Sequence, residues 1–471
     1  MRKTKIICTL GPAVDSDEKI RQLIENGMNA ARFNFSHGTH ESHLATLNRL
    51  KRIRDQTGSP VATILDTKGP EIRIKSFANG KIELHKGDLF VLTTQDVPGN
   101  EERVSVTYSD LHNELEPGTR VLIDDGLVEL KVTEIQGQDI VCLVESGGEL
   151  SNNKSINIPG THIHLPSLTD KDRSDIAFAV EQEFDFIAAS FVRKASDVDD
   201  IRAELHKHGG DGIRIISKIE NQEGVDNLAE IILASDGIMV ARGDLGVEIP
   251  AHEVPIIQKK MIHDCIQRGK PVITATQMLD SMIRNPRPTR AEVSDVANAV
   301  FDGTSAVMLS GETASGKYPI EALATMVDTV CSAEDAIDYW ERFEHTDPNL
   351  NHSISDAITH TCCTTAMDLN ATAILAATLS GDTARVIARF KPACPIVALT
   401  MSEQVRRQLA ITWGVYPLLY GKVDTTDRLL YLCVDCTRKE GLIKPGDTVV
   451  ITAGVPLAES TNTNLIKAQV V

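Results

Sequence analysis

Residues 213–246 read IRIISKIENQEGVDNLAEIILASDGIMVARGDLG, and this stretch indicates the fold class. Two short apolar runs, Ile213–Lys218 and Gly237–Ala241, flank a segment that is long enough for a helix. Runs of this length rich in Ile and Val are typical of buried strands. A strand, a helix and a second strand in this order form the repeating unit of parallel α/β proteins.

The same unit recurs on both sides of that stretch. Helix-length segments fill seven of the gaps between the runs, for example Asp17–Asn26, His40–Thr57, Ser196–His206 and Arg290–Phe301. Eight βα repeats predict an α/β fold of the (β/α)₈ TIM-barrel type. The eight apolar runs are Lys5–Thr9, Ala30–Asn34, Val61–Asp66, Phe186–Ala189, Ile213–Lys218, Gly237–Ala241, Pro271–Ala275 and Ala306–Leu309.

One gap between barrel strands, from Asp66 to Phe186, is far too long for a single helix. Apolar and polar residues alternate in it, as in Val128–Val132, and turn pairs such as Asn79-Gly80 and Asp125-Gly126 punctuate it. Such a pattern is typical of antiparallel strands joined by hairpins. We therefore predict an inserted all-β lid domain, a β-barrel over residues 70–168, and a discontinuous barrel domain over residues 1–69 and 169–343.

A third domain is expected over residues 344–471. The polar run Glu341–Ser353 is interpreted as a linker. Apolar strands alternate with helical segments beyond it, which predicts an α/β domain. The expected strands are Ala373–Ala377, Ile396–Thr400, Gly414–Leu419 and Thr448–Thr452.

Composition narrows the class of protein. The 471 residues are enough for about three domains, and the formal net charge of −18 disfavours nucleic acid as a partner. No apolar run is long enough to span a membrane, and the N-terminus lacks the apolar core of a signal peptide. These features predict a soluble cytoplasmic protein. Cys433 and Cys436 form a single CxxC pair, which we interpret as buried reduced thiols rather than a metal or redox site.

Charged and hydroxyl residues gather where the predicted strands end, which is where TIM barrels hold their active sites. Five strand ends contribute to this rim. They are Arg32-Phe33-Asn34-Phe35-Ser36-His37, Asp66-Thr67-Lys68, Lys218-Ile219-Glu220, Arg242-Gly243-Asp244 and Thr276-Gln277.

The residue types at this rim indicate a metal-assisted site for a small phosphorylated acid. Glu220 and Asp244 offer the hard oxygen ligands that suit Mg²⁺. Arg32 and Lys218 offer cations for a phosphate and for a developing oxyanion. The glycine-rich segment Arg242–Gly246 offers backbone N–H groups at the start of a short helix, a common cradle for anions.

Each motif taken alone also has a purely structural interpretation. Lys218 and Glu220 could form a surface ion pair, Arg32 could pair with Asp66, and Asp66-Thr67 could cap a helix. The segment Gly311–Lys317 matches the beginning of a phosphate-binding loop, GxxxxGK, and would suit a P-loop ATPase. Tyr318 stands where that loop needs Ser or Thr, so this alternative is disfavoured.

Over essentially its whole length the sequence resembles pyruvate kinase, in particular bacterial members of the family that lack an extra C-terminal extension. The matching segments include "TKIICTLGPA", "RFNFSHG", "LDTKGPEIR", "SFVRKASDV", "ISKIENQEG", "GIMVARGDLGVEIP", "VITATQMLDSMI" and "NPRPTRAEVSDVANAVFDGTSAVMLSGE". The rival interpretation is another TIM-barrel enzyme that acts on phosphoenolpyruvate or pyruvate. The all-β insertion and "DTKGPEIR" favour pyruvate kinase.

The resemblance implies phosphoryl transfer from phosphoenolpyruvate to ADP, giving pyruvate and ATP, in a homotetramer that needs Mg²⁺ (or Mn²⁺) and K⁺. The lid would exclude water from the site. The implied roles are Arg32 and Lys218 at the phosphoryl group and enolate; Gly243, Asp244 and Thr276 at the substrate carboxylate; Glu220 and Asp244 at Mg²⁺; Asn34, Ser36, Asp66 and Thr67 at K⁺; and Asn34, His37, Arg73 and Lys154 at the nucleotide.

The resemblance also implies two regulatory features. Glu at the position of Glu71 is typical of members that depend on K⁺. The segment Thr378–Arg385 matches an effector phosphate loop, in which Thr378, Ser380, Gly381 and Thr383 would hold the phosphate. The second loop of that site, Gly454–Thr463, carries no Arg and no Trp, and Asp382 adds a negative charge. We therefore expect an effector with one phosphate, such as a sugar monophosphate or AMP.

Overall fold

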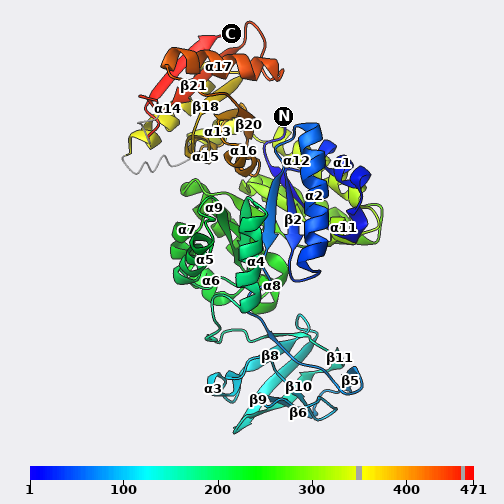
Figure 1. Ribbon diagram of the computed structural model, residues 1–471. Coiled ribbons are helices and arrows are strands. Elements are labelled where there is room, and N and C mark those ends of the chain that lie inside the picture. Colours follow the sequence, from blue (N-terminus) through cyan, green and yellow to red (C-terminus); the bar gives the residue numbers. More distant parts are fainter. Residues whose placement is uncertain (346–352, 458–461) are drawn as a thin grey trace.

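Eight parallel strands close into a barrel at the centre of the molecule (Figure 1). The structure is a computed structural model that describes residues 1–345, 353–457 and 462–471. The predicted TIM barrel is confirmed, with strands in the order β1-β17-β16-β15-β14-β13-β3-β2. Their bounds are β1 (Lys5–Thr9), β2 (Ala30–Asn34), β3 (Ala62–Asp66), β13 (Phe186–Ala189), β14 (Arg214–Ile219), β15 (Gly237–Ala241), β16 (Val272–Ala275) and β17 (Ala306–Leu309).

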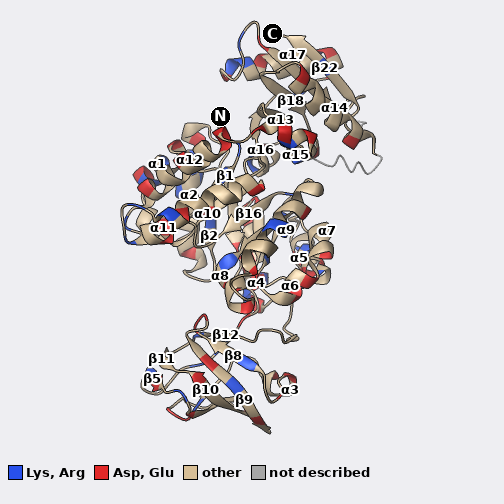
Figure 2. Ribbon diagram, turned by 180° about the vertical axis from the view of Figure 1, so that it is seen from behind, with Lys and Arg blue, Asp and Glu red and all other residues tan. Residues whose placement is uncertain are grey.

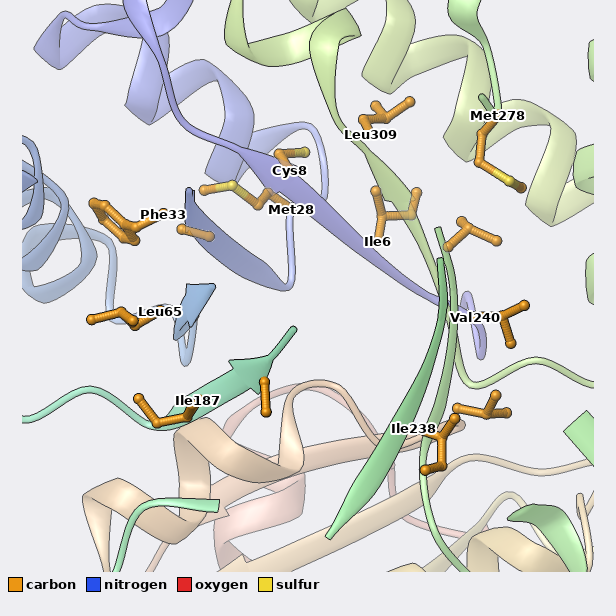
Figure 3. Close-up of a cluster of buried hydrophobic side chains, with 14 of the residues drawn as sticks. Ile6, Cys8, Met28, Phe33, Leu65, Ile187, Ile238, Val240, Met278 and Leu309 are labelled. Carbon is orange, nitrogen blue, oxygen red and sulfur yellow. The ribbon is translucent and has the colours of Figure 1, made fainter. Parts of the chain in front are cut away.

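Helices surround the barrel, and apolar side chains fill both sides of the strands. Alternate residues such as Ile6 and Leu65 pack outward against the helices, where Figure 3 shows part of this cluster. The residues between them, such as Ile7 and Ile64, fill the barrel itself. The longer helices are α1 (Asp17–Glu25), α2 (His40–Thr57), α4 (Asp170–Glu181), α5 (Ala195–Lys207), α7 (Leu228–Ala234), α9 (Val254–Gln267), α10 (Arg290–Asp302) and α12 (Pro319–Asp335).

Local sequence signals fix where these helices begin. The N-cap residues Thr39, Thr169 and Thr289 each accept a hydrogen bond from the backbone three residues on, in a reciprocal capping box. Such caps satisfy N–H groups that the helix itself leaves unpaired. Among the described helices, none is long and apolar enough to cross a membrane.

The insertion between β3 and β13 is an all-β domain at the end of the barrel (Figure 1). Its main sheet runs β4-β12-β8-β9-β10-β6-β7, and β11 pairs with β5. The two edges of the main sheet meet, because Lys75 N donates to Ser105 O (2.7 Å) and Thr107 N donates to Arg73 O (2.8 Å). The elements are β4 (Ile72–Arg73), β5 (Lys81–Leu84), β6 (Leu89–Thr93), β7 (Arg103–Ser105), α3 (Leu111–Glu114), β8 (Arg120–Ile123), β9 (Val128–Gln136), β10 (Asp139–Ser146), β11 (Gly148–Ser151) and β12 (Ser155–Asn157).

The C-terminal α/β domain lies at the opposite end of the barrel (Figure 1). Its sheet has the order β20-β19-β18-β21-β22 and carries apolar clusters on both faces. The four predicted strands are confirmed, and the sequence missed antiparallel β22. The elements are α14 (Ile354–Asp368), β18 (Ala373–Ala377), α15 (Asp382–Arg389), β19 (Ile396–Thr400), α16 (Glu403–Leu409), β20 (Val415–Leu419), α17 (Thr426–Lys439), β21 (Thr448–Ala453) and β22 (Leu465–Val470).

The expected linker, Glu341–Ser353, starts inside a helix. The first residues of the expected linker belong to helix α13 (Tyr339–Glu344). Two aromatic contacts hold this helix in place: Tyr339 packs on Trp413, and Phe343 packs on Phe390. Residues 346–352 lie outside the described part of the chain. Both cysteines of the CxxC pair lie in α17 as free thiols; Cys433 is buried as expected, whereas Cys436 is only half-buried.

The C-terminal domain closes the N-terminal end of the barrel. Ile411, which follows α16, packs with the side chains inside the barrel. Arg407 Nε lies 2.8 Å from Oδ1 of the fully buried Asp185, which directly precedes β13. Lys5 Nζ donates to Val415 O (2.6 Å). The C-terminal domain therefore covers this end of the barrel, and the β domain lies at the other end. Acidic and basic residues are interspersed over all three bodies (Figure 2).

Candidate active site

A buried ionic network joins the ends of the barrel strands β2, β3 and β14. Arg32 near the end of β2 lies with Nε 2.6 Å from Oδ2 of Asp66, the last residue of β3. Lys218 of β14 lies with Nζ 3.1 Å from Oδ1 of the same carboxylate. Asp66 is only 1% exposed, so both cations share one desolvated carboxylate. The structural alternative, that Arg32 pairs with Asp66, is therefore also correct.

Lys218 continues the network toward the outside of the barrel. Its Nζ lies 2.9 Å from Glu220 Oε1 and donates to Ser190 Oγ at 2.7 Å. The other oxygen of Glu220 accepts the backbone N–H of Phe191 at 2.6 Å. Lys218 thus stands between two carboxylates, one inside the barrel and one facing outward.

The electrostatics of the network favour the charged forms of Asp66 and Lys218 but not that of Glu220. Burial alone would raise the pKa of Asp66, but the charges of Arg32 and Lys218 outweigh burial and hold that pKa below its ordinary value. Burial would lower the pKa of Lys218, but Asp66 and Glu220 together raise it. For Glu220, burial raises the pKa to about 7, and the charge of Asp244 adds to that effect while Lys218 opposes it.

The rim residues Gly243, Asp244 and Thr276 lie together. Asp244 belongs to the first turn of α8 (Arg242–Glu248). Gly243 N donates to Thr276 Oγ1 at 2.8 Å, and that hydroxyl donates to Ala275 O at 2.7 Å. Thr276 has a left-handed φ of 65°, a conformation that a β-branched residue adopts only under constraint from its surroundings.

Arg242 supplies much of that constraint. Its Nη2 donates to Thr276 O at 2.7 Å. Its Nη1 lies 2.8 and 2.7 Å from the two carboxylate oxygens of Asp295. Arg242 therefore holds the backbone of Thr276 in place. The sequence pattern alone had suggested only that the segment Arg242–Gly246 offers backbone N–H groups to an anion.

A cleft of about 490 Å³ opens between the barrel and the β domain. Glu220 and Asp244 line it from the barrel, and Arg73 and Lys154 line it from the β domain. The two carboxylates thus face the same space as the two cations. Arg32, Asp66, Lys218, Gly243 and Thr276 do not belong to its lining, so the buried network lies behind Glu220.

The cations on the β-domain side are held by local acids. Arg73 Nη2 lies 2.6 Å from Glu71 Oε1, and Lys154 Nζ lies 2.9 Å from Asp124 Oδ1. About a third of each cationic side chain is exposed, 34% for Arg73 and 33% for Lys154. Both cations are therefore accessible from the cleft.

The loop after β2 carries the remaining predicted residues. Asn34 Oδ1 accepts the backbone N–H of Ser36 at 3.1 Å, and the carbonyl of His37 lies 2.8 Å from His43 Nε2. Thr67 N donates to Ala188 O at 3.0 Å, which anchors the residue after Asp66 to β13. Ser36 and His37 are exposed, and neither belongs to the lining of the cleft.

The donor set at the cleft suits a hard divalent cation. Glu220 and Asp244 present carboxylate oxygens, and the charge of Asp244 raises the pKa of Glu220. A cation between the two carboxylates would relieve their repulsion. In the described ranges 1–345, 353–457 and 462–471, no group of three or more His, Cys, Asp or Glu side chains is arranged as a complete metal site. Further ligands would have to be substrate oxygens or water.

In the C-terminal domain, the predicted effector loop lies between β18 and α15. Gly381 N donates to Thr378 Oγ1 (3.0 Å), with Gly381 at a φ of 88°. Ser380 Oγ donates to Asp382 Oδ2 at 2.6 Å. Thr383 Oγ1 lies 2.7 Å from Thr463 Oγ1, which joins this loop to the second one. Residues 458–461 of the second loop lie outside the described part of the chain.

Sequence reasoning missed two hydroxyls of the buried network. Ser190 directly follows β13, and Thr9 ends β1 and accepts from Arg32 Nη1 at 3.1 Å. Both stand at strand ends, so the rule that found the other five strand ends applies to them as well. The segment Gly311–Lys317 is no phosphate loop here, because the Glu312 carboxylate accepts the N–H groups of Leu279 and Ser310.

Known proteins share this architecture. The family model "Pyruvate kinase, barrel domain" matches residues 1–323, and "Pyruvate kinase, alpha/beta domain" matches residues 356–469. The chain is 52% identical to a pyruvate kinase of Geobacillus stearothermophilus, over 100% of this chain and 80% of the relative. It is 49% identical to a pyruvate kinase of Clostridium acetobutylicum, over 100% of both chains.

A solved structure agrees with these matches. The crystal structure of a pyruvate kinase from Cryptosporidium parvum superposes with a TM-score of 0.95 at 42% identity, covering 100% of this chain and 96% of the other. The matches include the inserted β domain and the C-terminal domain as well as the barrel, which favours this family over other TIM-barrel enzymes and over P-loop ATPases. The chain therefore belongs to the pyruvate kinase family.

Proposed function

We propose that this chain, a phosphotransferase, moves the phosphoryl group of phosphoenolpyruvate to ADP and so forms pyruvate and ATP. The observation that carries the proposal is the buried network in which Arg32, Asp66, Lys218 and Glu220 follow one another from the barrel interior to the cleft. The test is pyruvate formation from phosphoenolpyruvate with and without ADP. Pyruvate release that is equally fast without ADP would identify a phosphatase instead.

Within this reaction, Arg32 and Lys218 neutralise charge. The terminal oxygen of ADP attacks phosphorus in line while the enolate leaves, so the protein contributes mainly position and electrostatics. Arg32 would hold the phosphoryl oxygens, and Lys218 would stabilise the enolate oxygen as its negative charge develops. Asp66 keeps both cations in place and charged before the substrate arrives. The Thr276 hydroxyl and the N–H of Gly243, now bonded to each other, would turn to the substrate carboxylate.

Glu220 and Asp244 would hold Mg²⁺, or Mn²⁺ in its place. Bound there, the ion would act as a Lewis acid toward the phosphoryl and enolate oxygens. The proposal is supported by two carboxylates that line the same cleft. Glu220→Gln, which keeps the shape and removes the charge, should weaken Mn²⁺ binding measured by calorimetry without substrate. Unchanged Mn²⁺ affinity would contradict the assignment.

The nucleotide would bind between the barrel and the β domain. Arg73 and Lys154 face the cleft and would meet the phosphates of ADP, while Asn34 and His37 would contact the nucleotide from the loop after β2. Closure of the β domain would exclude water from a phosphoryl group that could otherwise hydrolyse. Arg73→Gln should raise the KM for ADP more than the KM for phosphoenolpyruvate, and an equal effect on both would argue against this placement.

A monovalent cation, K⁺, would bind near Asn34, Ser36, Asp66 and Thr67, whose oxygens include one carboxylate. Activity in potassium salts should exceed activity in tetramethylammonium salts. The Glu71→Lys variant should narrow that difference, because an ammonium group supplies a charge in place of the ion. Equal rates of the unaltered protein in both salts would contradict the proposal.

Regulation is proposed at the loop Thr378–Thr383 in a homotetramer. The hydroxyls of Thr378, Ser380 and Thr383 and the N–H of Gly381 would hold one phosphate of a sugar monophosphate or of AMP. Coupling of about 1–3 kcal/mol would shift the affinity for phosphoenolpyruvate roughly 5- to 150-fold. Titrations with ribose 5-phosphate, AMP and fructose 1,6-bisphosphate test this, and Thr383→Glu should abolish activation while basal turnover persists. Light scattering of the unliganded protein tests the tetramer.

A further inference from the structure

A small cavity lies at the junction of the barrel and the C-terminal domain, between residues of α9 and α15. Its volume is about 20 Å³. The barrel contributes the end of α9 and the residues before β16, and the C-terminal domain contributes α15 and the residues around Trp413. The lining is Ile266, Gly269, Lys270, Pro271, Ser305, Arg385, Ala388, Arg389, Lys391, Thr412 and Trp413.

Four of these residues are cationic and none is acidic. Three of the four have partners elsewhere. Lys270 Nζ donates to the carbonyls of Ile232, Leu233 and Ser235 at 2.6–2.8 Å, which uses all three of its protons. Arg385 pairs with Asp382 (2.6 Å), and Arg389 lies 3.3 Å from Asp356. Within the described part of the chain, the four cationic groups of the lining are thus paired with only two carboxylates, those of Asp382 and Asp356.

Lys391 is the group without a counter-charge. It is 5% exposed, and within the described residues no hydrogen bond or ion pair reaches its Nζ; its one contact is with the ring of Trp413, 4.3 Å from the centroid. Burial and the charge of Arg342 lower the pKa of Lys391 well below its ordinary value, against the charge of Glu334. Glu334 is itself engaged, because its oxygens accept the backbone N–H groups of Lys3 and Thr4 at 2.8 and 2.5 Å.

We infer that this cavity binds one small inorganic anion of the chloride class, with Lys391 Nζ as its hydrogen-bond donor and the neighbouring guanidinium groups as supporting charge. A buried ammonium group without a partner is costly, and an anion beside it removes that cost. The cavity, with a volume of about 20 Å³, admits a water-sized particle such as a halide.

The competing state is a neutral Lys391 amine in an empty or water-filled cavity. The two states respond differently to salt. An anion that binds only the folded protein raises its melting temperature by mass action, whereas a neutral amine leaves only the general effect of each salt on stability, which Lys391→Met would share. The site is independent of catalysis, so it can be tested without substrate or divalent metal and irrespective of the proposed function.

The experiment compares thermal unfolding of the full chain in potassium chloride and in potassium glutamate at equal ionic strength. We expect chloride to raise the melting temperature by about 1–3 °C beyond the general effect of the salt. Lys391→Met, which is one atom shorter and removes the charge, should lose that increment. The matched control Lys467→Met, at an exposed position of β22, should keep it.

Crystals soaked in potassium bromide give a second measurement that needs no variant. An anomalous peak beside Lys391 Nζ supports the inference. If other bromide sites in the same crystal are occupied and no peak lies beside Lys391 Nζ, the inference is overturned. The inference also fails if Lys391→Met shows the same difference in melting temperature between chloride and glutamate as the unaltered protein.

Discussion

Replacing Lys218 with Met separates the catalytic from the structural role of the buried network. The Met side chain fills a similar volume but leaves both carboxylates without this cation. Asp66 keeps Arg32, whose Nε lies 2.6 Å away. Glu220 keeps only the N–H of Phe191, at 2.6 Å. The loss of charge therefore falls mainly on Glu220.

Two magnitudes follow. Removing one preorganised charge from a transition state typically lowers kcat by about 10²–10³, or about 2.7–4 kcal/mol. Breaking a buried ion pair from one side costs about 3–5 kcal/mol of folding stability. Glu220 lines the cleft but is only 1% exposed, so the full range applies, and the urea midpoint is measured beside kcat to show that the variant is folded at the assay temperature.

A matched control exists at the other end of the barrel. Arg407 and Asp185 form a pair of the same burial, with side chains 12% and 0% exposed, compared with 11% and 1% for Lys218 and Asp66. Arg407→Met should cost similar stability in a urea titration but leave kcat within about twofold. Lys218→Met with kcat near that of the unaltered protein, or Arg407→Met with an equal loss of kcat, would refute the assignment of Lys218.

Three further predictions concern neighbouring residues. Ser190→Ala removes the oxygen that accepts from Lys218 at 2.7 Å and should lower kcat about tenfold at unchanged stability; a fall in stability instead of kcat in steady-state and urea measurements would assign it a structural role only. Gly69 has a φ of 71°, and an added Cβ would lie 2.8 Å from Ser190 Cβ, so Gly69→Ala should cost about 1–3 kcal/mol in urea unfolding; an unaltered midpoint would show that the turn adapts. Burial lowers the pKa of His43 below its ordinary 6.5, so the unfolded chain binds a proton below that pH that the folded chain does not, and stability is lost as the pH falls from 6.5 toward the folded pKa. His43→Gln, which keeps a donor for the carbonyl of His37, should flatten that part of the pH profile of thermal unfolding, and a profile of unaltered slope would exclude His43 as its cause.

The barrel strands were predictable because both of their faces are buried. A strand between the barrel interior and a helix layer is apolar throughout, so each appears as a short uninterrupted run, as in Ala306–Leu309, all of which is buried. Strand β22 lacks this signal. It is an edge strand with no fully buried residue, so its sequence differs little from that of a loop.

Helix α13 shows a different limit. Its polar residues suggested a linker, but Tyr339 and Phe343 stand four residues apart on one helical face and pack on the C-terminal domain. The i, i+4 spacing was a visible signal. Its target, formed by Trp413 and Phe390, lies far along the chain, and only the tertiary structure brings the two together.

The sequence indicated the pairs Arg32–Asp66 and Lys218–Glu220, which the structure contains, but not the contacts of Lys218 with Asp66 and Ser190. Strand ends predicted which side chains reach the rim. Which carboxylate Lys218 contacts depends on the order of the strands, since β14 and β3 are separated by β13 in the barrel. Asp66 is shared between Arg32 and Lys218, and Ser190 hydrogen-bonds to both Asp66 and Lys218. Both facts follow from this three-dimensional order alone.

The pairing of β1 with β17 has a consequence for synthesis of the chain. Lys5 pairs with Ala306, so the barrel cannot close until most of the polypeptide has left the ribosome, and until then β1 and the barrel strand made last present open edges that can pair with other chains. The inserted β domain has its own apolar core and can fold during this interval. Nascent chains stalled before residue 306 should therefore be aggregation-prone and depend on chaperones, although they already contain one finished domain.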